Sequence, residues 1–111
     1  MFDGIRLDQR PADFTRPLGF SGMDGVLMAN ALHFVKAKPP VLALVRSYLK
    51  PGGTFVLVEY DVDRGNLWVP YPIGFTTWLA VAPAAGFIGA RLLGRLPSRF
   101  LNAIYSSGAT V

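Results

Sequence analysis

Two apolar segments limit the folds open to this chain, because residues 23–29 and 54–60 are dominated by hydrophobic side chains with little polar alternation. Uninterrupted runs of this length are typical of strands that a parallel sheet buries on both faces. Between them, Pro39 and Pro40 open a segment with apolar residues at helical spacing. These residues are Val41, Leu42, Leu44, Val45, Tyr48 and Leu49. The order strand, amphipathic helix, strand is therefore predicted.

The link between the helix and the second strand is Lys50-Pro51-Gly52-Gly53. Proline cannot continue a helix, and the two glycines can adopt the positive φ angles that a tight reversal needs. A strand, helix and strand joined in this way form a right-handed crossover with the two strands parallel. The sequence therefore predicts the α/β class.

The segment from 61 to 90 combines a loop with an uncharged helix. Gly65, Pro70 and Pro72 break residues 61–72, so this part is expected to be a long loop. A helix of about ten residues should follow from position 73. Residues 67–90 carry no charge, but three prolines and three glycines interrupt them, so no membrane span is predicted. We expect the uncharged helix to pack against a partner or a missing domain.

The remaining residues predict a strand pair at the end of the chain. Residues 87–93 are expected to form one strand, 94–98 a turn and 99–106 a last strand. A link as short as this turn makes the two strands antiparallel.

Composition excludes several classes of function. Half of the residues (51%) are hydrophobic and 16% are charged, which argues against a disordered tail and implies apolar surface that needs cover. The chain has no cysteine and one histidine, so disulfides, thiolate metal sites and zinc are not expected. The formal charge of +4 comes without a dense basic run, and we predict no nucleic-acid partner. The start of the chain lacks a secretion signal, so a cytoplasmic location is the expectation.

Three segments resemble a known family when taken in order: Ala-Asp-Phe-Thr at 12–15, Asp-Gly-Val-Leu-Met-Ala-Asn-Ala-Leu-His-Phe-Val at 24–35, and Tyr-Leu-Lys-Pro-Gly-Gly-Thr-Phe-Val-Leu-Val-Glu-Tyr at 48–60. They resemble the latter half of a class I S-adenosylmethionine-dependent methyltransferase, over residues 12–106. Such enzymes have a Rossmann-like sheet of seven strands, with the seventh antiparallel between the fifth and sixth. The resemblance implies that the four predicted strands are numbers four to seven of that sheet, with flanking helices.

The same resemblance implies that the first half of the domain is missing. The family begins with a strand, a glycine-rich turn and an acidic residue after the second strand, which together hold most of the cofactor. Gly19, Gly22 and Gly25 precede a strand instead of following one, so they do not fit that turn. We therefore expect a shortened chain, with an irregular segment at 1–22 and the carboxyl-terminal half of a methyltransferase domain at 23–111.

The resemblance also implies cofactor contacts. Asp13 and Phe14 occupy the position that meets the adenine of S-adenosylmethionine, although an ordinary loop aspartate fits Asp13 equally well. Asn30 follows the fourth strand, where the family contacts the methionine portion of the cofactor, and Ala29, Asn30 and Ala31 are the expected contacts there. This position agrees with a general rule for open α/β sheets, which bind ligands at the carboxyl ends of their strands.

Other residues at the same edge are candidates for catalysis and for binding a small-molecule substrate. His33 can accept a proton near neutral pH, which makes it a weak catalytic candidate, but a structural role at the start of the following helix is the favoured interpretation. The expected substrate contacts are Glu59, Tyr60, Asp61, Trp68, Tyr71, Arg95 and Arg99. The two arginines suit a carboxylate or phosphate, and the aromatic residues could instead cap the core.

Two functions therefore stay open from the sequence. One is methyl transfer from S-adenosylmethionine to an oxygen, nitrogen or carbon of a small molecule. The other is a non-catalytic remnant or interaction module that self-associates through the free edge of the strand at 23–29, because such an apolar edge invites pairing.

Overall fold

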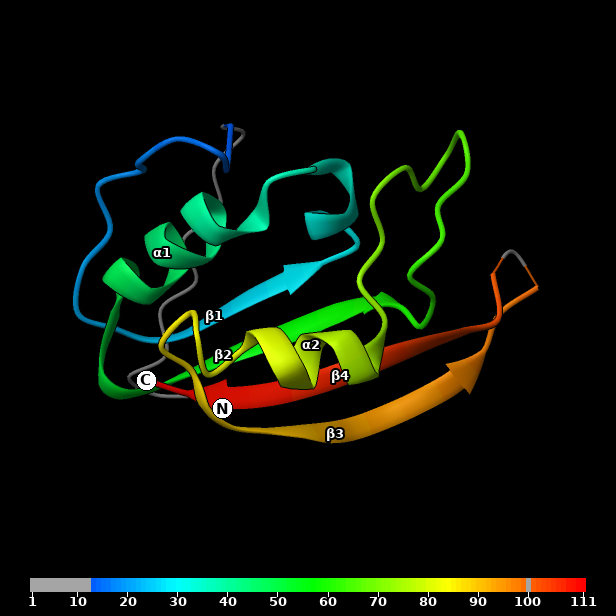
Figure 1. Cartoon of the computed structure of the whole chain (residues 1–111). Helices are drawn as coiled ribbons and strands as arrows, with labels where there is room; N and C mark the ends of the chain where they lie inside the picture. Colours follow the sequence, from blue (N-terminus) through cyan, green and yellow to red (C-terminus); the bar gives the residue numbers. More distant parts are fainter. Residues whose placement is uncertain (1–12, 100) are drawn as a thin grey trace, which may run out of the picture.

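The computed structural model describes residues 13–99 and 101–111 (Figure 1). Its elements, in chain order, are β1 (Met23–Ala29), the 3₁₀ helix η1 (Leu32–Phe34), α1 (Lys38–Tyr48), β2 (Leu49–Tyr60), α2 (Phe75–Val81), β3 (Ile88–Pro97) and β4 (Ala103–Thr110). None of the helices within these residues is long and apolar enough to cross a membrane.

The four strands form one mixed sheet in the order β1-β2-β4-β3 (Figure 1). β1 and β2 are parallel and are connected through α1, while β4 is antiparallel to both of its neighbours. The last strand of the chain therefore lies inside the sheet, between β2 and β3. This arrangement confirms the α/β class and the partial Rossmann-like sheet predicted from the sequence.

Helix α1 packs on the sheet through the apolar face that its spacing predicts. Val41, Leu42, Val45 and Tyr48 are buried, and prolines occupy the first turn of the helix, where a missing N–H costs no hydrogen bond. Burial of each aliphatic side chain of this size contributes roughly 1.5–3 kcal/mol. Hydrophobic burial on one face therefore fixes α1 against β1 and β2.

The predicted reversal at residues 50–53 lies inside β2 in the structure. Met23 pairs with Leu49 and Gly25 pairs with Thr54, so residues 50–53 bulge out of the ladder. Gly52 adopts a φ of 80°, and its amide donates to the carbonyl of Val111. Hydrogen bonds to the last residue of the chain keep this segment in the sheet, which the local sequence could not reveal.

The strand boundaries predicted for the last two strands were wrong. β3 continues through Pro97 and β4 begins at Ala103, so residues 94–97 belong to a strand instead of the predicted turn at 94–98. Gly94 is not a turn residue; it stays opposite Ser106, directly after a shift of register in the ladder. Proline is tolerated at the end of β3 because β3 is an edge strand. The predicted antiparallel pairing of the two strands is confirmed.

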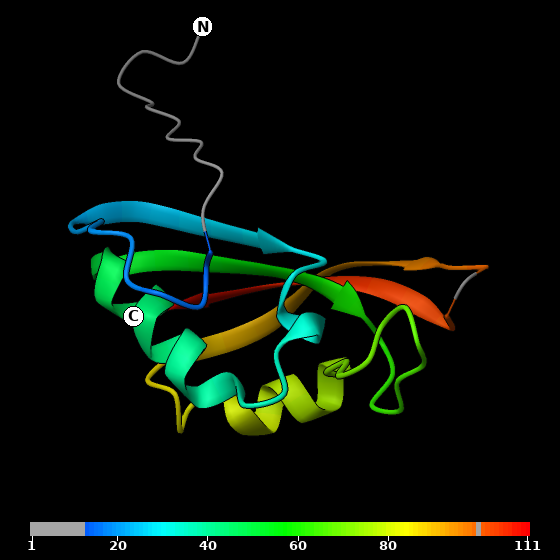
Figure 2. The same ribbon diagram turned by 90° about the horizontal axis from the view of Figure 1, so that it is seen from above.

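The two faces of the sheet differ in cover. Both α helices lie on one face (Figure 2), where a buried cluster includes Phe55, Trp78 and Phe87. The opposite face, called the open face below, carries no helix within the described residues. On it Leu27 is 68% exposed and Leu96 is 71% exposed. The prediction that the strand at 23–29 is buried on both faces is therefore wrong for this structure.

Candidate functional site

The carboxyl ends of β1 and β2 form one rim of the sheet. Ala29 pairs with Val58, and the backbone N–H of Asn30 donates to the carbonyl oxygen of Val58 at 2.9 Å. Asn30 and Glu59 therefore leave the sheet at the same end, as the crossover predicts. Asn30 has a φ of 53°, a left-handed conformation that asparagine tolerates better than most residues. The chain turns away from the sheet at this point and exposes the end of the β1 backbone.

A buried histidine–glutamate pair lies directly behind this rim. Glu59 is 0% exposed and His33, in η1, is 3% exposed. The Nδ1 atom of His33 lies 2.7 Å from Oε1 of Glu59, and the backbone N–H of His33 donates to Oε2 at 3.2 Å. One carboxylate thus holds both the ring and the main chain of the histidine. We call His33 and Glu59 the dyad.

The carboxylate also sets which ring nitrogen of His33 can take a proton. A carboxylate beside Nδ1 makes Nδ1 the hydrogen-bond donor, so the neutral imidazole carries its lone pair on Nε2. Nε2 makes no hydrogen bond within the described residues, and no described side-chain N or O atom there is buried without a partner. Nε2 is therefore the ring nitrogen with an unshared lone pair, in a side chain that is 4% exposed.

The long loop at residues 61–74 is fastened to the dyad through backbone groups. The amide of Tyr71 donates to the carbonyl of His33 at 2.9 Å, and Nζ of Lys38 donates to the carbonyl of Tyr71 at 2.6 Å. Nζ of Lys38 also donates to the carbonyl of Val35. Burial lowers the pKa of Lys38, although the nearby Glu59 opposes this shift. The exposed rings of Trp68 and Tyr71 are thereby carried on a loop that contacts the dyad.

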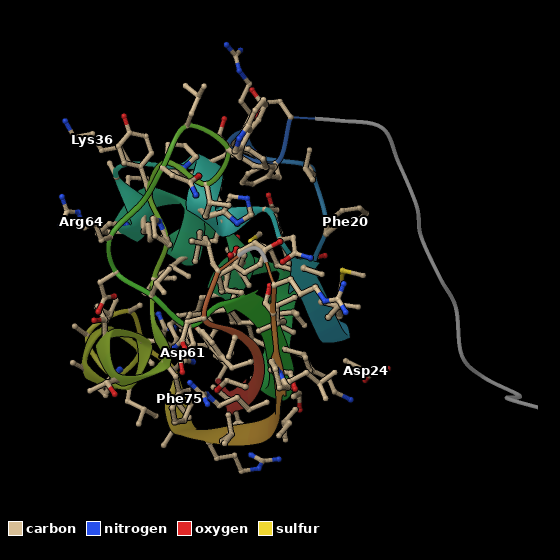
Figure 3. All side chains as sticks on the ribbon, turned by 90° about the vertical axis from the view of Figure 1, so that its right-hand side faces the viewer. Phe20, Asp24, Lys36, Asp61, Arg64 and Phe75 are labelled. Atoms are coloured by element: carbon tan, nitrogen blue, oxygen red, sulfur yellow. The ribbon has the colours of Figure 1, made fainter. Side chains whose placement is uncertain are left out.

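A second carboxylate, Asp61, has a separate set of partners near the same rim (Figure 3). Its Oδ2 accepts from Nε of Arg95 at 2.9 Å, and its Oδ1 accepts from the amide of Phe75 at 2.9 Å. Burial alone would raise the pKa of Asp61, but the Phe75 amide and Arg95 together hold it below its ordinary value. Asp61 therefore ties the end of β2 to the start of α2 and to β3.

The remaining sequence-predicted residues are placed apart from the dyad. Asp13 accepts hydrogen bonds from the backbone amide and the hydroxyl of Thr15, and the hydroxyl bond is the main reason that the pKa of Asp13 is lowered. Phe14 lines an apolar cavity beside β1 and α1. Arg99 is exposed in the turn between β3 and β4. Of the candidates, the structure groups His33, Glu59, Tyr60 and the backbone of Tyr71.

The dyad is the feature that sequence reasoning missed, although both members were candidates separately. A glutamate that ends an apolar strand is a usable signal, because a carboxylate buried there needs a partner. The parallel register places Glu59 beside the end of β1, and η1 then returns His33 toward it. The 3₁₀ turn itself has no distinct sequence signal.

No protein-family model matches the chain. A highly reducing polyketide synthase, pkhB, from Emericella nidulans is 31% identical over 100 residues, which cover 82% of this chain and 4% of the synthase. Solved structures are similar at a TM-score of 0.70 for the 1,6-didemethyltoxoflavin-N1-methyltransferase of Burkholderia thailandensis, crystallised with S-adenosylhomocysteine, and 0.71 for the CurJ carbon methyltransferase. Their sequence identities to this chain are 20% and 24%. A possible histamine N-methyltransferase of Thermotoga maritima has a TM-score of 0.73 at 15% identity.

These comparisons define the class of fold. Each of the three structures covers 89% of this chain, whereas the chain spans 48%, 33% and 61% of them, respectively. Together with the β1-β2-β4-β3 order, this shows that the chain has the fold of one half of a class I S-adenosylmethionine-dependent methyltransferase domain. The strands correspond to numbers four to seven of that domain, as the resemblance implies.

Proposed function

We propose that this chain is the part of an S-adenosylmethionine-dependent methyltransferase that activates a small-molecule acceptor for methylation at carbon. The observation that carries the proposal is the dyad: a buried carboxylate 2.7 Å from a histidine whose other ring nitrogen makes no hydrogen bond within the described residues. A positioned base of this kind is needed when the acceptor must lose a proton before or during methyl transfer.

In this mechanism, Nε2 of His33 removes a proton from an acidic carbon of the acceptor. Glu59 keeps the proton on Nδ1, which holds the lone pair on Nε2, and it stabilises the imidazolium that forms. Glu59 has no exposed surface, so it acts through His33 and does not itself touch the substrate. Tyr60, and the loop that carries Trp68 and Tyr71, would hold the acceptor and limit water at the base.

The class of acceptor follows from the need for a base and from the similar proteins. A carbon beside a carbonyl group is acidic enough for a histidine to deprotonate once the enzyme stabilises the resulting negative charge. One similar protein is named as a polyketide synthase and another as a carbon methyltransferase. A β-keto thioester, which has such a carbon between two carbonyl groups, fits both the dyad and these names.

The residues at the rim fit one side of the cofactor. Ala29 ends the parallel strand β1, and Asn30 and Ala31 follow it, where free backbone groups can contact a ligand; the backbone turns in a left-handed conformation at Asn30. When bound there, S-adenosylmethionine supplies the methyl group. Asp13 and Phe14 are proposed for the adenine, although Thr15 already bonds the carboxylate of Asp13. Methyl transfer is proposed for the assembled domain, because the chain spans about half of the first similar structure.

The experiment that tests this proposal measures proton exchange at the acceptor carbon and does not require the cofactor. The chain is mixed with a β-keto thioester in D₂O, and loss of the α-proton signal is followed by NMR. We expect the native chain to accelerate exchange above the buffer rate, and His33→Asn to lower this acceleration by roughly 10²-fold or more. Equal exchange rates for the native chain and His33→Asn would contradict the role of His33 as a base.

Two further variants distinguish loss of the catalytic base from general damage to the fold. Arg91→Gln changes an exposed side chain on β3, the strand at the other edge of the sheet from β1, so it should exchange protons at nearly the native rate. Glu59→Gln should be slower than native, because the amide no longer fixes the tautomer of His33.

A further inference from the structure

Lys38, the first residue of α1, has an ammonium group that connects two separate segments of the chain. Its Nζ donates to the carbonyl oxygen of Val35, directly after η1, at 2.7 Å and to the carbonyl oxygen of Tyr71, in the loop at residues 61–74, at 2.6 Å. Hydrogen bonds from an ammonium group are charge-assisted and therefore stronger than those between neutral groups. Lysine side chains usually extend into water, whereas Lys38 is partly buried. A specific task at this position explains the difference.

Both polar backbone groups of Tyr71 are bonded to the segment that contains the dyad histidine. The N–H of Tyr71 donates to the carbonyl oxygen of His33 at 2.9 Å, and its C=O accepts from Lys38. One hydrogen bond alone would let the loop pivot about His33, but a second bond on the following peptide unit also fixes its orientation. The loop lies on the helix-bearing side of the sheet, away from the open face (Figure 2). Lys38 therefore holds the loop against η1.

The outer part of this loop is kept in shape by its own hydrogen bonds. Oδ1 of Asn66 accepts from the backbone amides of Trp68 and Val69, both at 2.9 Å, and the amide of Asn66 donates to the carbonyl of Val69 at 3.0 Å. A Cβ at Gly65 would overlap the carbonyl oxygen of Val69, so the chain returns on itself closely. The loop is therefore one rigid unit, and the position of Tyr71 sets the position of Trp68, which is 67% exposed.

We propose that Lys38 is a positioning residue for the methyl acceptor. Its ammonium group holds the loop against η1, so that Trp68 and Tyr71 contact the acceptor when the acceptor carbon reaches Nε2 of His33. Lys38 acts through the loop and does not itself touch the substrate. The effect on the acceptor rests on the proposed function, whereas the effect on the position of the loop does not.

A role of Lys38 as a second base fits these contacts less well. Carbonyl oxygens only accept hydrogen bonds, so Lys38 must donate to both of them. Burial lowers the pKa of Lys38, but the negative charge of Glu59 opposes this shift and favours the ammonium form. An ammonium group has no lone pair with which to take a proton. The lysine therefore supplies hydrogen bonds and charge.

The position of the loop can be measured without substrate or cofactor. The chain has two tryptophans, Trp68 on the loop and Trp78 in the core, so 5-fluorotryptophan gives one ¹⁹F NMR signal for each. Lys38→Met removes the donors but keeps an unbranched side chain. It should shift the Trp68 signal and make the amide of Tyr71 exchange with D₂O roughly 10-fold faster, while the Trp78 signal stays in place and reports an intact core. Lys36→Met replaces an exposed lysine (Figure 3) and should match the native chain.

The effect on the acceptor is measured with the same proton-exchange assay as for His33. The two members of the dyad keep their contacts in Lys38→Met, whereas the loop that holds the acceptor is released. We therefore expect the KM for the β-keto thioester to rise roughly 5-fold or more and the maximal exchange rate to stay within about 2-fold of the native rate. General damage to the fold would lower the maximal rate instead.

Chemical rescue shows whether the ammonium group is the cause. The chain has no cysteine, so Lys38→Cys can be alkylated at this one thiol. Treatment with 2-bromoethylamine rebuilds a side chain of the same length as lysine with an ammonium group at its end. Treatment with 1-bromopropane gives a neutral side chain of the same length. We expect only the ammonium form to restore the native KM and the native Trp68 signal.

Three results would overturn the inference. They are an unmoved Trp68 signal with an unchanged Tyr71 amide in Lys38→Met, an unchanged KM in a variant whose loop has moved, and equal recovery with the two reagents. If the native chain catalyses no proton exchange, the proposed function fails, and the fluorine and amide measurements still decide whether Lys38 holds the loop.

Discussion

Glu59 and Asp61 are two residues apart at the end of β2, and they show how burial changes what a carboxylate does. Glu59 is fully buried and bonded to His33, whereas Asp61 is partly exposed and bonded to Arg95. Two paired polar groups inside a protein interact more strongly than the same groups in water. If one partner is removed, however, water cannot take its place, so the other is left buried without a partner. Near the surface, water and salt screen the pair. We therefore expect a catalytic arrangement from the first pair and an anchoring role for the second.

The largest expected effect is that of removing His33 while leaving Glu59 in place. His33→Leu leaves a buried carboxylate without its ring partner, which should lower the free energy of unfolding by about 3–5 kcal/mol in urea denaturation at pH 7. The double variant His33→Leu with Glu59→Leu removes both polar groups and should recover much of this loss. A single variant as stable as the native chain, within about 0.5 kcal/mol, would contradict the idea of mutual dependence.

A smaller effect is expected when Glu59 keeps its shape but loses its charge. Glu59→Gln still offers one oxygen, but its amide group cannot accept the second hydrogen bond from His33, so we expect a loss of about 2 kcal/mol in the same measurement. The imidazole nitrogen shifts of His33 provide a second readout. They should report a proton on Nδ1 in the native chain and a mixture of tautomers in the variant. An unchanged tautomer would show that Glu59 does not set it.

For the exposed pair, Asp61→Asn should lower the free energy of unfolding by at most about 1 kcal/mol at pH 7. The loss is small because the amide oxygen of asparagine can still accept the hydrogen bond from the backbone N–H of Phe75. The pKa of Asp61 is lower in the folded chain than in the unfolded chain. The stabilisation is therefore complete above the ordinary aspartate pKa of about 4 and is lost as the pH falls through the folded value. Urea denaturation at pH 7, 5 and 3.5 should show a shallower acid decline in Asp61→Asn than in the native chain. Parallel declines would contradict this assignment.

The comparison also shows which features of the fold could be predicted from the sequence. The alternation of apolar runs and helical spacing predicts β1, α1 and β2, since each depends on residues close in the chain. The bulge at residues 50–53 could not be predicted, because it is held by Val111, about sixty residues away. The extension of β3 past Gly94 has the same origin, because a ladder to β4 outweighs the local preference of glycine and proline for turns.

The position of the candidate site at one rim of the sheet could be predicted from the sequence. The hydrogen-bond partners of its side chains could not. Strand order and direction place Asn30, Glu59 and Asp61 at one rim. The choice of partner is decided by tertiary packing: Glu59 points into the core beneath η1, while Asp61 faces Phe75 and Arg95. Glu59 and Asp61 are two positions apart, so the alternation of an extended strand directs both side chains to the same side. The difference in burial arises from the elements that cover each position.

The smallest expected effect is that of replacing Arg95, and its dependence on salt concentration distinguishes the exposed pair from the buried pair. Arg95→Gln removes the charged partner of Asp61 on an exposed strand, and at low ionic strength we expect a loss of about 0.2–1 kcal/mol in urea denaturation. Raising the salt concentration to 1 M shortens the Debye length to about 3 Å, so the difference between Arg95→Gln and the native chain should nearly disappear. The loss caused by His33→Leu should persist at the same salt concentration, because the dyad is shielded from mobile ions. If both losses fall to the same extent, burial does not distinguish the two carboxylates, and Glu59 has no advantage over Asp61 in controlling a neighbouring base.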